Sequence, residues 1–128
     1  MKPFESTENY LECILMLGEK KPCVHSVDVA HQLGVSKPTV SVTMKRLREQ
    51  GYLTVSADGC LELTGAGQEI AVRIYERHKV LAQMFMSLGV SEETAFQDAC
   101  LVEHDLSDET FACIKAHALQ SGIGSEEE

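Results

Sequence analysis

Three side chains that can bind metals, Cys100, Glu103 and His104, lie close together in the sequence. Residues three and four apart project from the same face of a helix. A thiolate, a carboxylate and an imidazole on one face can together bind a divalent transition metal. The pattern therefore indicates a metal site, although a buried structural thiol beside a solvated polar face would produce the same spacing.

Further candidate ligands are distant in sequence. His78 lies in a long predicted helix, and Glu12 lies in the first predicted helix, one turn after Asn9. Taken alone, a histidine or a carboxylate in such a position is more often a solvated surface residue than a ligand. Spacing alone therefore does not connect these residues with Cys100.

A second group of residues, over positions 26–47, has the spacing of a helix-turn-helix. Small Ala30 allows the two helices to approach each other, and Gly34 supplies the turn. An exposed helix start offers N–H groups to phosphates and hydroxyls to base edges, so we predict binding to double-stranded DNA. The alternative is a three-helix module that binds only protein. The predicted DNA-binding residues are Ser36, Lys37, Pro38, Thr39, Ser41, Lys45 and Arg46.

Charge is distributed unevenly along the chain, whose net charge is −9. Residues 1–63 carry 7 basic and 8 acidic side chains, whereas residues 64–128 carry 4 basic and 12 acidic ones. The basic side chains of the first half cluster in the predicted second helix of the helix-turn-helix, which favours contact with a polyanion. The acidic second half is suited to binding a cation.

The cysteines indicate a reducing compartment. They are odd in number and widely spaced, and no two form a CxxC pair, so we expect reduced thiols in the cytoplasm rather than a disulfide framework. The sequence has no signal-peptide pattern and no long apolar run, so we expect no membrane association. The five cysteines are Cys13, Cys23, Cys60, Cys100 and Cys113.

Apolar periodicity and capping residues predict a mainly α chain with one hairpin, in which Asp58-Gly59 makes the turn. Three helices followed by two strands make a winged helix-turn-helix, expected over residues 1–63. A helical dimerisation and metal-binding domain is expected over residues 64–120, and a disordered acidic tail over residues 121–128. The predicted helices are 6–20, 26–33, 36–50, 64–88, 91–104 and 107–119, and the predicted strands are 53–55 and 61–63.

Several of these motifs together resemble one family, the iron- and manganese-dependent transcriptional repressors that include the diphtheria toxin repressor and the manganese transport regulator. The resemblance implies a DNA-binding repressor that controls metal homeostasis and binds its operator as a homodimer. The chain resembles the short branch, which lacks a C-terminal SH3-like domain. The matching stretches are Thr7–Ile14, Ser36–Ser41, Leu63–Gly67, Arg77–His78 and Cys100–Ser107.

The resemblance also implies a ligand set. Asn9 stands where the family has Asp or Met, so its role as a ligand is doubtful. Cys100 matches the iron-type members, whereas Glu12 and the chain length match the manganese type. A thiolate is softer than manganese prefers, so Fe(II) is the first choice and Mn(II) the second. The implied ligands are Glu12, His78, Cys100, Glu103 and His104.

Other family features do not transfer to this chain. The second metal site of the long branch is not expected, because Ala82 and Phe96 cannot ligate through their side chains. Val42 stands where iron-type members place a base-contacting Gln, so their operator preference is not carried over. Apolar residues are expected at the dimer interface, and an intramolecular core would suit them equally well. They are Leu81, Phe85, Leu88, Phe111 and Ile114.

Three other functions are compatible with parts of the pattern. The five cysteines allow a metal-independent, thiol-redox-sensing winged-helix regulator, which thiol oxidation but not a chelator would inactivate. An enzyme would use Cys100 as nucleophile and His104 as base, but no oxyanion-binding loop is evident, so we do not expect an enzyme. A structural helix-turn-helix scaffold would bind no DNA.

Overall fold

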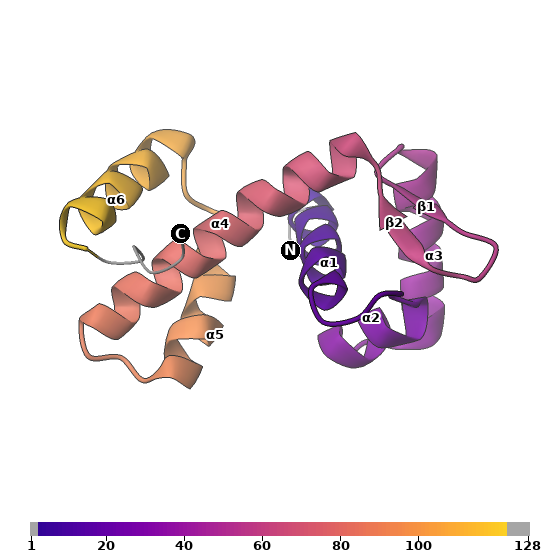
Figure 1. The fold of residues 1–128 in the computed structure, drawn as a ribbon, viewed down its shortest axis with the longest axis horizontal. Coiled ribbons are helices and arrows are strands. Elements are labelled where there is room, and N and C mark those ends of the chain that lie inside the picture. Colours follow the sequence, from indigo (N-terminus) through magenta and orange to yellow (C-terminus); the bar gives the residue numbers. More distant parts are fainter. Residues whose placement is uncertain (1–2, 123–128) are drawn as a thin grey trace. The chain divides into compact units, whose positions relative to one another are not determined.

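The computed structural model describes residues 3–122, which are mainly helical (Figure 1). The chain divides into two compact units, residues 1–72 and 73–128, and α4 continues from the first into the second. Most of the predicted tail, residues 123–128, lies outside the described residues. The elements are α1 Pro3–Gly18, α2 Ser26–Leu33, α3 Lys37–Glu49, β1 Leu53–Val55, β2 Leu61–Leu63, α4 Gly65–Ser87, α5 Glu92–Val102 and α6 Asp108–Gln120.

The first unit is the expected winged helix-turn-helix. Its core takes Leu11 from α1, Val29 from α2, Val40 and Leu47 from α3, and Leu53 from β1. Each of these side chains is almost completely buried. Burying a side chain of this size contributes about 1.5–3 kcal/mol, so this cluster is the main support of the DNA-binding unit.

Two helix starts in this unit differ in their capping. Ser36 caps α3 as expected, since its hydroxyl accepts a hydrogen bond from the Thr39 N–H at 3.2 Å. The helix α2 was predicted to start at Ser26 and does so, but its N-cap residue is His25. The Asp28 carboxylate accepts the His25 N–H at 2.8 Å. An acidic residue at the third helical position satisfies the backbone N–H of the N-cap residue, as in a capping box.

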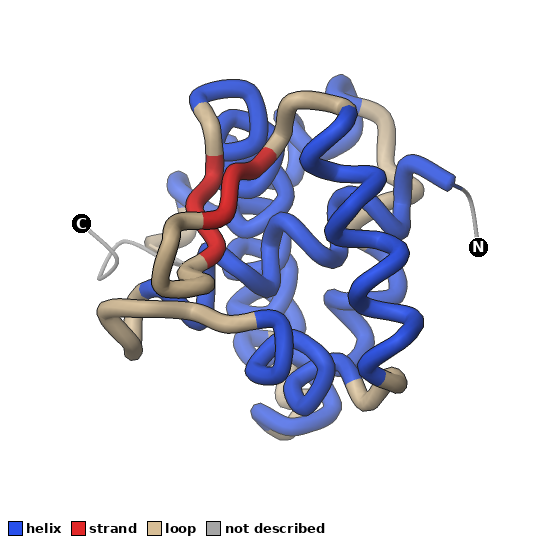
Figure 2. The backbone as a smooth tube through the Cα atoms, turned by 90° about the vertical axis from the view of Figure 1, so that its right-hand side faces the viewer, coloured by secondary structure: helices blue, strands red, loops and turns tan. Residues whose placement is uncertain are grey.

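The wing is a short antiparallel hairpin, drawn as two red strands in Figure 2, in which Leu53 pairs with Leu63. Gly59 has a φ of 83°, which makes a turn that favours glycine. A backbone bond from the Leu61 N–H to the Val24 carbonyl, 2.7 Å long, also joins β2 to the segment before α2. The wing is therefore held by hydrogen bonds between its two strands and by a bond to the segment before α2.

The start of α4 packs closely against the end of α3. Thr64 donates its hydroxyl to the Gly51 carbonyl at 2.6 Å and accepts the Gly67 N–H at 3.2 Å. Its own N–H donates to the Tyr52 carbonyl at 3.0 Å. A Cβ at Gly67 would collide with that same carbonyl oxygen, whereas Gly65 has open space around it. Gly67 is therefore required for the close approach, although it weakens the helix itself.

The second unit has a smaller core between α4 and α5. Leu81, Ala82 and Ala99 are buried, with Phe85 and Ile114 packed partly buried against them. Among the residues expected at a dimer interface, Leu81 and Phe111 are thus already buried within the chain. Leu88 is 75% exposed. An intramolecular core is therefore the correct alternative for Leu81 and Phe111, but it does not describe Leu88.

Two helix ends and one cysteine pair differ from the expectations. The first helix begins at Pro3 and ends at Gly18, whereas residues 6–20 were predicted. The α5 helix ends at Val102, so His104 lies in the turn that follows. The prediction of reduced cysteines is contradicted at Cys23 and Cys60, which form a disulfide.

No helix within residues 3–122 has the length and apolar character needed to cross a membrane.

Candidate metal centre

Three of the predicted ligands converge in the second unit. His78 on α4 lies 2.9 Å from Glu103, measured from Nδ1 to Oε1. The Cys100 Sγ atom lies 3.7 Å from the same His78 nitrogen. One donor atom from each of these residues lies within 4.8 Å of the other two. We call this group the α4–α5 cluster.

The α4–α5 cluster combines a buried base with a buried acid. His78 and Glu103 are both buried, whereas Cys100 is exposed. Burial lowers the pKa of His78, but hydrogen bonds with Cys100 and Glu103 raise it, and the resulting pKa is about 10. The imidazole therefore carries a proton at neutral pH in the metal-free protein, between two groups that favour its positive charge.

The donor set of this cluster is suited to a divalent transition metal. Glu103 is 0% exposed, and its second oxygen, Oε2, is buried without a hydrogen bond from the described residues. A buried carboxylate oxygen without a hydrogen bond is costly, and a cation bound beside Oε2 would offset that cost. Nitrogen, sulfur and oxygen donors together suit Fe(II), Zn(II) and related ions. The residues present therefore fit the metal that the resemblance implies.

His104 lies beside the α4–α5 cluster, outside the group of mutually close donors. Its Nε2 atom is 3.5 Å from Glu103 Oε2, and its side chain is buried. His104 lies two residues beyond the end of α5, whereas Glu103 is the C-cap residue and keeps a helical backbone conformation. Helical spacing therefore relates Cys100 to Glu103 but not to His104.

Arg77 holds the end of α5 in place. Its guanidinium donates to the Glu103 carbonyl at 3.1 Å and to the Leu106 carbonyl at 2.7 Å. It also lies over the Phe111 ring, 5.2 Å from its centroid. The last carbonyls of a helix lack partners within the helix, and this arginine supplies donors to that region. It therefore fixes the backbone that carries the Glu103 side chain.

The remaining predicted ligands, Glu12 and Asn9, belong to α1 in the first unit. Glu12 is buried, and Asn9 is partly buried. The neighbouring Cys13 thiol is also buried. Its burial, and to a smaller extent the charge of Glu12, raises the pKa of this thiol to about 12. A glutamate is rarely this buried.

The predicted DNA-binding residues lie around the start and along the outer face of α3. All are exposed except Arg46, which is partly buried and donates to the Thr7 hydroxyl at 3.3 Å. Val42 lies on the same helix and is 73% exposed. Val40 and Leu47 of the same helix are buried in the core. The exposed residues are Ser36, Lys37, Pro38, Thr39, Ser41 and Lys45.

Comparison with known proteins identifies both units. Residues 4–61 match the iron dependent repressor N-terminal DNA binding domain. Residues 64–119 match the iron dependent repressor metal binding and dimerisation domain. The transcriptional regulator MntR of Salmonella typhimurium is 35% identical over 122 residues, which cover 95% of this chain and 78% of that relative.

The chain belongs to the iron-dependent repressor family. A second relative, the HTH-type transcriptional regulator MntR of Geobacillus kaustophilus, is 35% identical over 82% of this chain and 74% of its own length. The family is one of metal-dependent, DNA-binding transcriptional repressors, so this repressor carries a DNA-binding domain followed by a metal-binding and dimerisation domain. The metal-independent redox regulator is accordingly not favoured.

Solved structures agree with this assignment. A manganese-dependent transcriptional repressor in complex with manganese has a TM-score of 0.80 and 29% identity, over 87% of this chain. The manganese regulator SloR has a TM-score of 0.77 and 25% identity, also over 87% of this chain. The repressor spans about half the length of these solved chains, 51% and 52% respectively.

Sequence reasoning missed a second cluster in the repressor. Cys23, His25 and Cys60 also place donor atoms within 4.8 Å of one another. The cysteines are 37 residues apart, and each is alone in its own stretch of sequence. No local spacing signals such a pair, because the folding of the wing brings them together.

Proposed function

We propose that this chain represses transcription by binding operator DNA through α3, as a homodimer, when the α4–α5 cluster holds a divalent cation. The observation that supports this is the convergence of His78, Cys100 and Glu103 in a largely buried position. A cation bound there would supply the positive charge that offsets the carboxylate and the thiolate. Regulators that act in this way typically couple the two sites by about 1–3 kcal/mol, or roughly 5–150-fold in operator affinity.

Fe(II) is the proposed physiological metal, with Mn(II) as the alternative. Cys100 supplies a soft sulfur donor, which iron accepts more readily than manganese does. Two of the similar solved structures are those of a manganese-dependent repressor and a manganese regulator, and this favours the alternative. Affinity alone will not distinguish the two, because later metals bind most nitrogen and sulfur sites more tightly than either.

Three further residues enter the proposed ligand set with weaker support. His104 is included because its imidazole lies beside Glu103. Glu12 and Asn9 are included only through the resemblance to the family. Each is tested by its own substitution, His104→Ala, Glu12→Gln and Asn9→Ala.

The DNA contacts are proposed from the exposed face of α3. Ser36 and Thr39 lie at the helix start, where hydroxyls approach base edges, whereas Lys45 suits a phosphate. In a homodimer, two such helices would enter successive major grooves about 34 Å apart. Because operator DNA lies in the cytoplasm of a cell without a nucleus, we propose the cytoplasm as the compartment of this chain.

The test is operator binding with and without each metal. Anaerobically purified protein should bind operator DNA at least fivefold more tightly with Fe(II) or Mn(II) than with a chelator present. Glu103→Gln removes the buried charge with little change of shape, and it should abolish that difference. Glu109→Gln is the matched control, because Glu109 is exposed on α6. If metal fails to tighten operator binding by the wild-type protein, the proposed function is wrong.

A further inference from the structure

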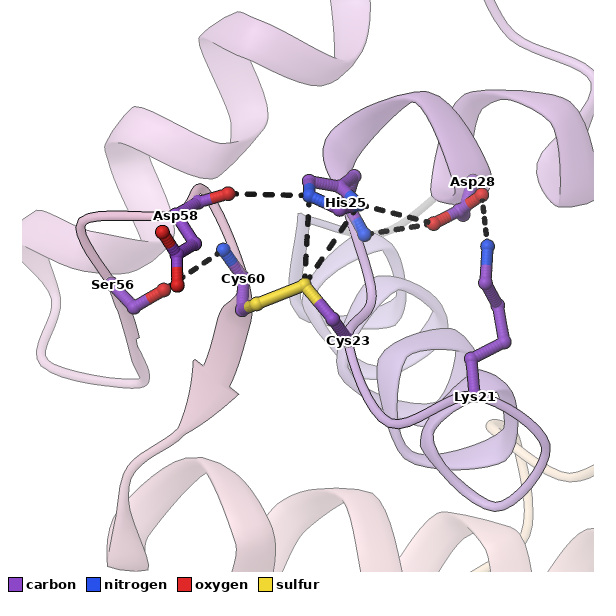
Figure 3. A network of polar contacts seen from close by, with 7 residues as sticks. All are labelled: Lys21, Cys23, His25, Asp28, Ser56, Asp58 and Cys60. Carbon is purple, nitrogen blue, oxygen red and sulfur yellow. Dashed lines mark hydrogen bonds and ion pairs between the residues drawn. A yellow bond between two sulfur atoms is a disulfide. The ribbon is translucent and has the colours of Figure 1, made fainter.

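A second group of metal-binding side chains lies in the DNA-binding unit, where the wing meets the segment before α2 (Figure 3). Cys23 Sγ lies 3.5 Å from His25 Nε2 and 3.9 Å from His25 Nδ1. Cys60 joins Cys23 through a disulfide whose Cα atoms are 5.1 Å apart. Both cysteines are partly buried.

The backbone around these three residues is held independently of the sulfur atoms. The Leu61 N–H donates to the Val24 carbonyl at 2.7 Å, so the residues that follow the two cysteines are paired directly. In the wing turn, the Cys60 N–H donates to the Ser56 hydroxyl at 3.1 Å. These bonds keep Cys23 and Cys60 together when the disulfide is reduced.

The imidazole is held over the wing by its own contacts. His25 Nε2 lies 3.3 Å from the Asp58 carbonyl, and the His25 N–H donates to Asp28 Oδ2. The pKa of Asp28 is lowered mainly by a hydrogen bond from Lys21 and secondly by the bond from the His25 backbone, so this carboxylate stays ionised. The cluster therefore consists of an imidazole beside two disulfide-bonded cysteine sulfurs on an ordered frame, as Figure 3 shows.

We propose that in the reduced protein Cys23, His25 and Cys60 bind a thiophilic divalent cation of the Zn²⁺ class. Two thiolates and one imidazole are donors that zinc prefers, and three protein ligands leave a fourth tetrahedral position for water. Because a disulfide sulfur has no thiolate charge to offer, the Cys23–Cys60 disulfide and the metal site are alternative states of the same atoms. Both states join the wing to the segment that leads into α2.

This site differs from the α4–α5 cluster in its position and donors. It lies in the first unit, it takes two sulfur atoms rather than one, and it contains no carboxylate. Its role would be structural, because a bound cation closes the long loop between Cys23 and Cys60 and stabilises the wing. The inference does not depend on the proposed repressor function, since it rests only on these residues.

Cobalt(II) is a suitable probe, because thiolate coordination to cobalt gives a charge-transfer absorption that carboxylate and imidazole ligands do not. The experiment uses Cys100→Ser protein, which removes the thiol of the α4–α5 cluster, reduced with a phosphine under anaerobic conditions. Titration with cobalt should produce the thiolate absorption, and one equivalent of Zn²⁺ should remove it. Adding Cys23→Ser or Cys60→Ser should abolish the absorption, whereas adding Cys113→Ser should leave it unchanged.

The imidazole is tested by competition between the protein and a chromophoric zinc indicator. His25→Ala in the Cys100→Ser protein should weaken Zn²⁺ binding at least tenfold. The control is His31→Ala, which removes an exposed histidine near the end of α2. Circular dichroism and a thiol count confirm that each variant is folded and reduced. The inference is wrong if folded, fully reduced Cys100→Ser protein gives no thiolate–cobalt absorption, or if Cys23 and Cys60 cannot be reduced without unfolding.

Discussion

Replacing Arg77 with Met should destabilise the second unit strongly. The guanidinium is 5% exposed and donates to two carbonyl oxygens, those of Glu103 and Leu106. Met has a similar length and can still pack against Phe111, but it offers neither a donor nor the charge that lies over that ring. Both carbonyls would then lose their partner in a buried or partly buried place.

The size of the effect follows from these bonds. Hydrogen bonds from a charged donor contribute about 1.5–3 kcal/mol each, so two of them give roughly 3–6 kcal/mol. The ion pair with Asp108 adds little, because that carboxylate is 85% exposed and well solvated. Apolar packing by Met recovers part of the loss, so we expect a decrease of about 3–4 kcal/mol in the free energy of unfolding.

Urea unfolding followed by circular dichroism, at fixed protein concentration and without metal, measures this change. Arg73→Met is the matched control, because Arg73 lies one turn earlier on α4 and is half exposed, 3.4 Å from Asp108. We expect its effect to be below about 1 kcal/mol. If Arg77→Met also costs less than about 1 kcal/mol, then the two carbonyls do not depend on the guanidinium, and our account of how Glu103 is positioned fails.

Three further changes have definite expected results. Lys45→Ala should weaken binding to any duplex and reduce the slope of log affinity against log salt by about 1, measured by fluorescence anisotropy; an unchanged slope would remove Lys45 from the phosphate contacts. Gly67→Ala should lower thermal stability because the new methyl group collides with Tyr52, whereas Gly65→Ala should be neutral or stabilising; equal melting temperatures would contradict the close approach. The proton on His78 stabilises the metal-free fold fully below about pH 6.5, and this stabilisation is lost as the pH rises towards 10. Because a metal must displace that proton, metal affinity should increase about tenfold per pH unit in this window, measured by competition with a chelator of known pH dependence. A flat profile would show that no proton is displaced.

The sequence predicts best those features that local chemistry determines. Ser36, Ser91 and Ser107 each cap a helix through a hydrogen bond with the residue three positions later. Both strands have the predicted bounds, because apolar alternation and an Asp-Gly turn are contained within a few residues. For the α4–α5 cluster, spacing alone connected Cys100 with Glu103, and His78 was added only through the family resemblance.

Features that depend on tertiary contacts were less predictable. Helix α5 ends at Val102 where Arg77, which is distant in sequence, satisfies the Glu103 carbonyl. The pairing of Cys23 with Cys60 requires the wing to fold back on the segment before α2. In both cases the deciding partner is far away in the chain, so no local pattern contains the information.

The packing of the first turns of α4 bears on how the protein can be divided experimentally. Ala71 is fully buried and belongs to the same core as Leu11 and Leu47. A fragment cut after the last strand would leave that core open and Tyr52 without its Thr64 partner, and it should be prone to aggregate. A fragment extended through Val72 keeps every residue of this core, so we expect it to fold on its own and to be suited to spectroscopy.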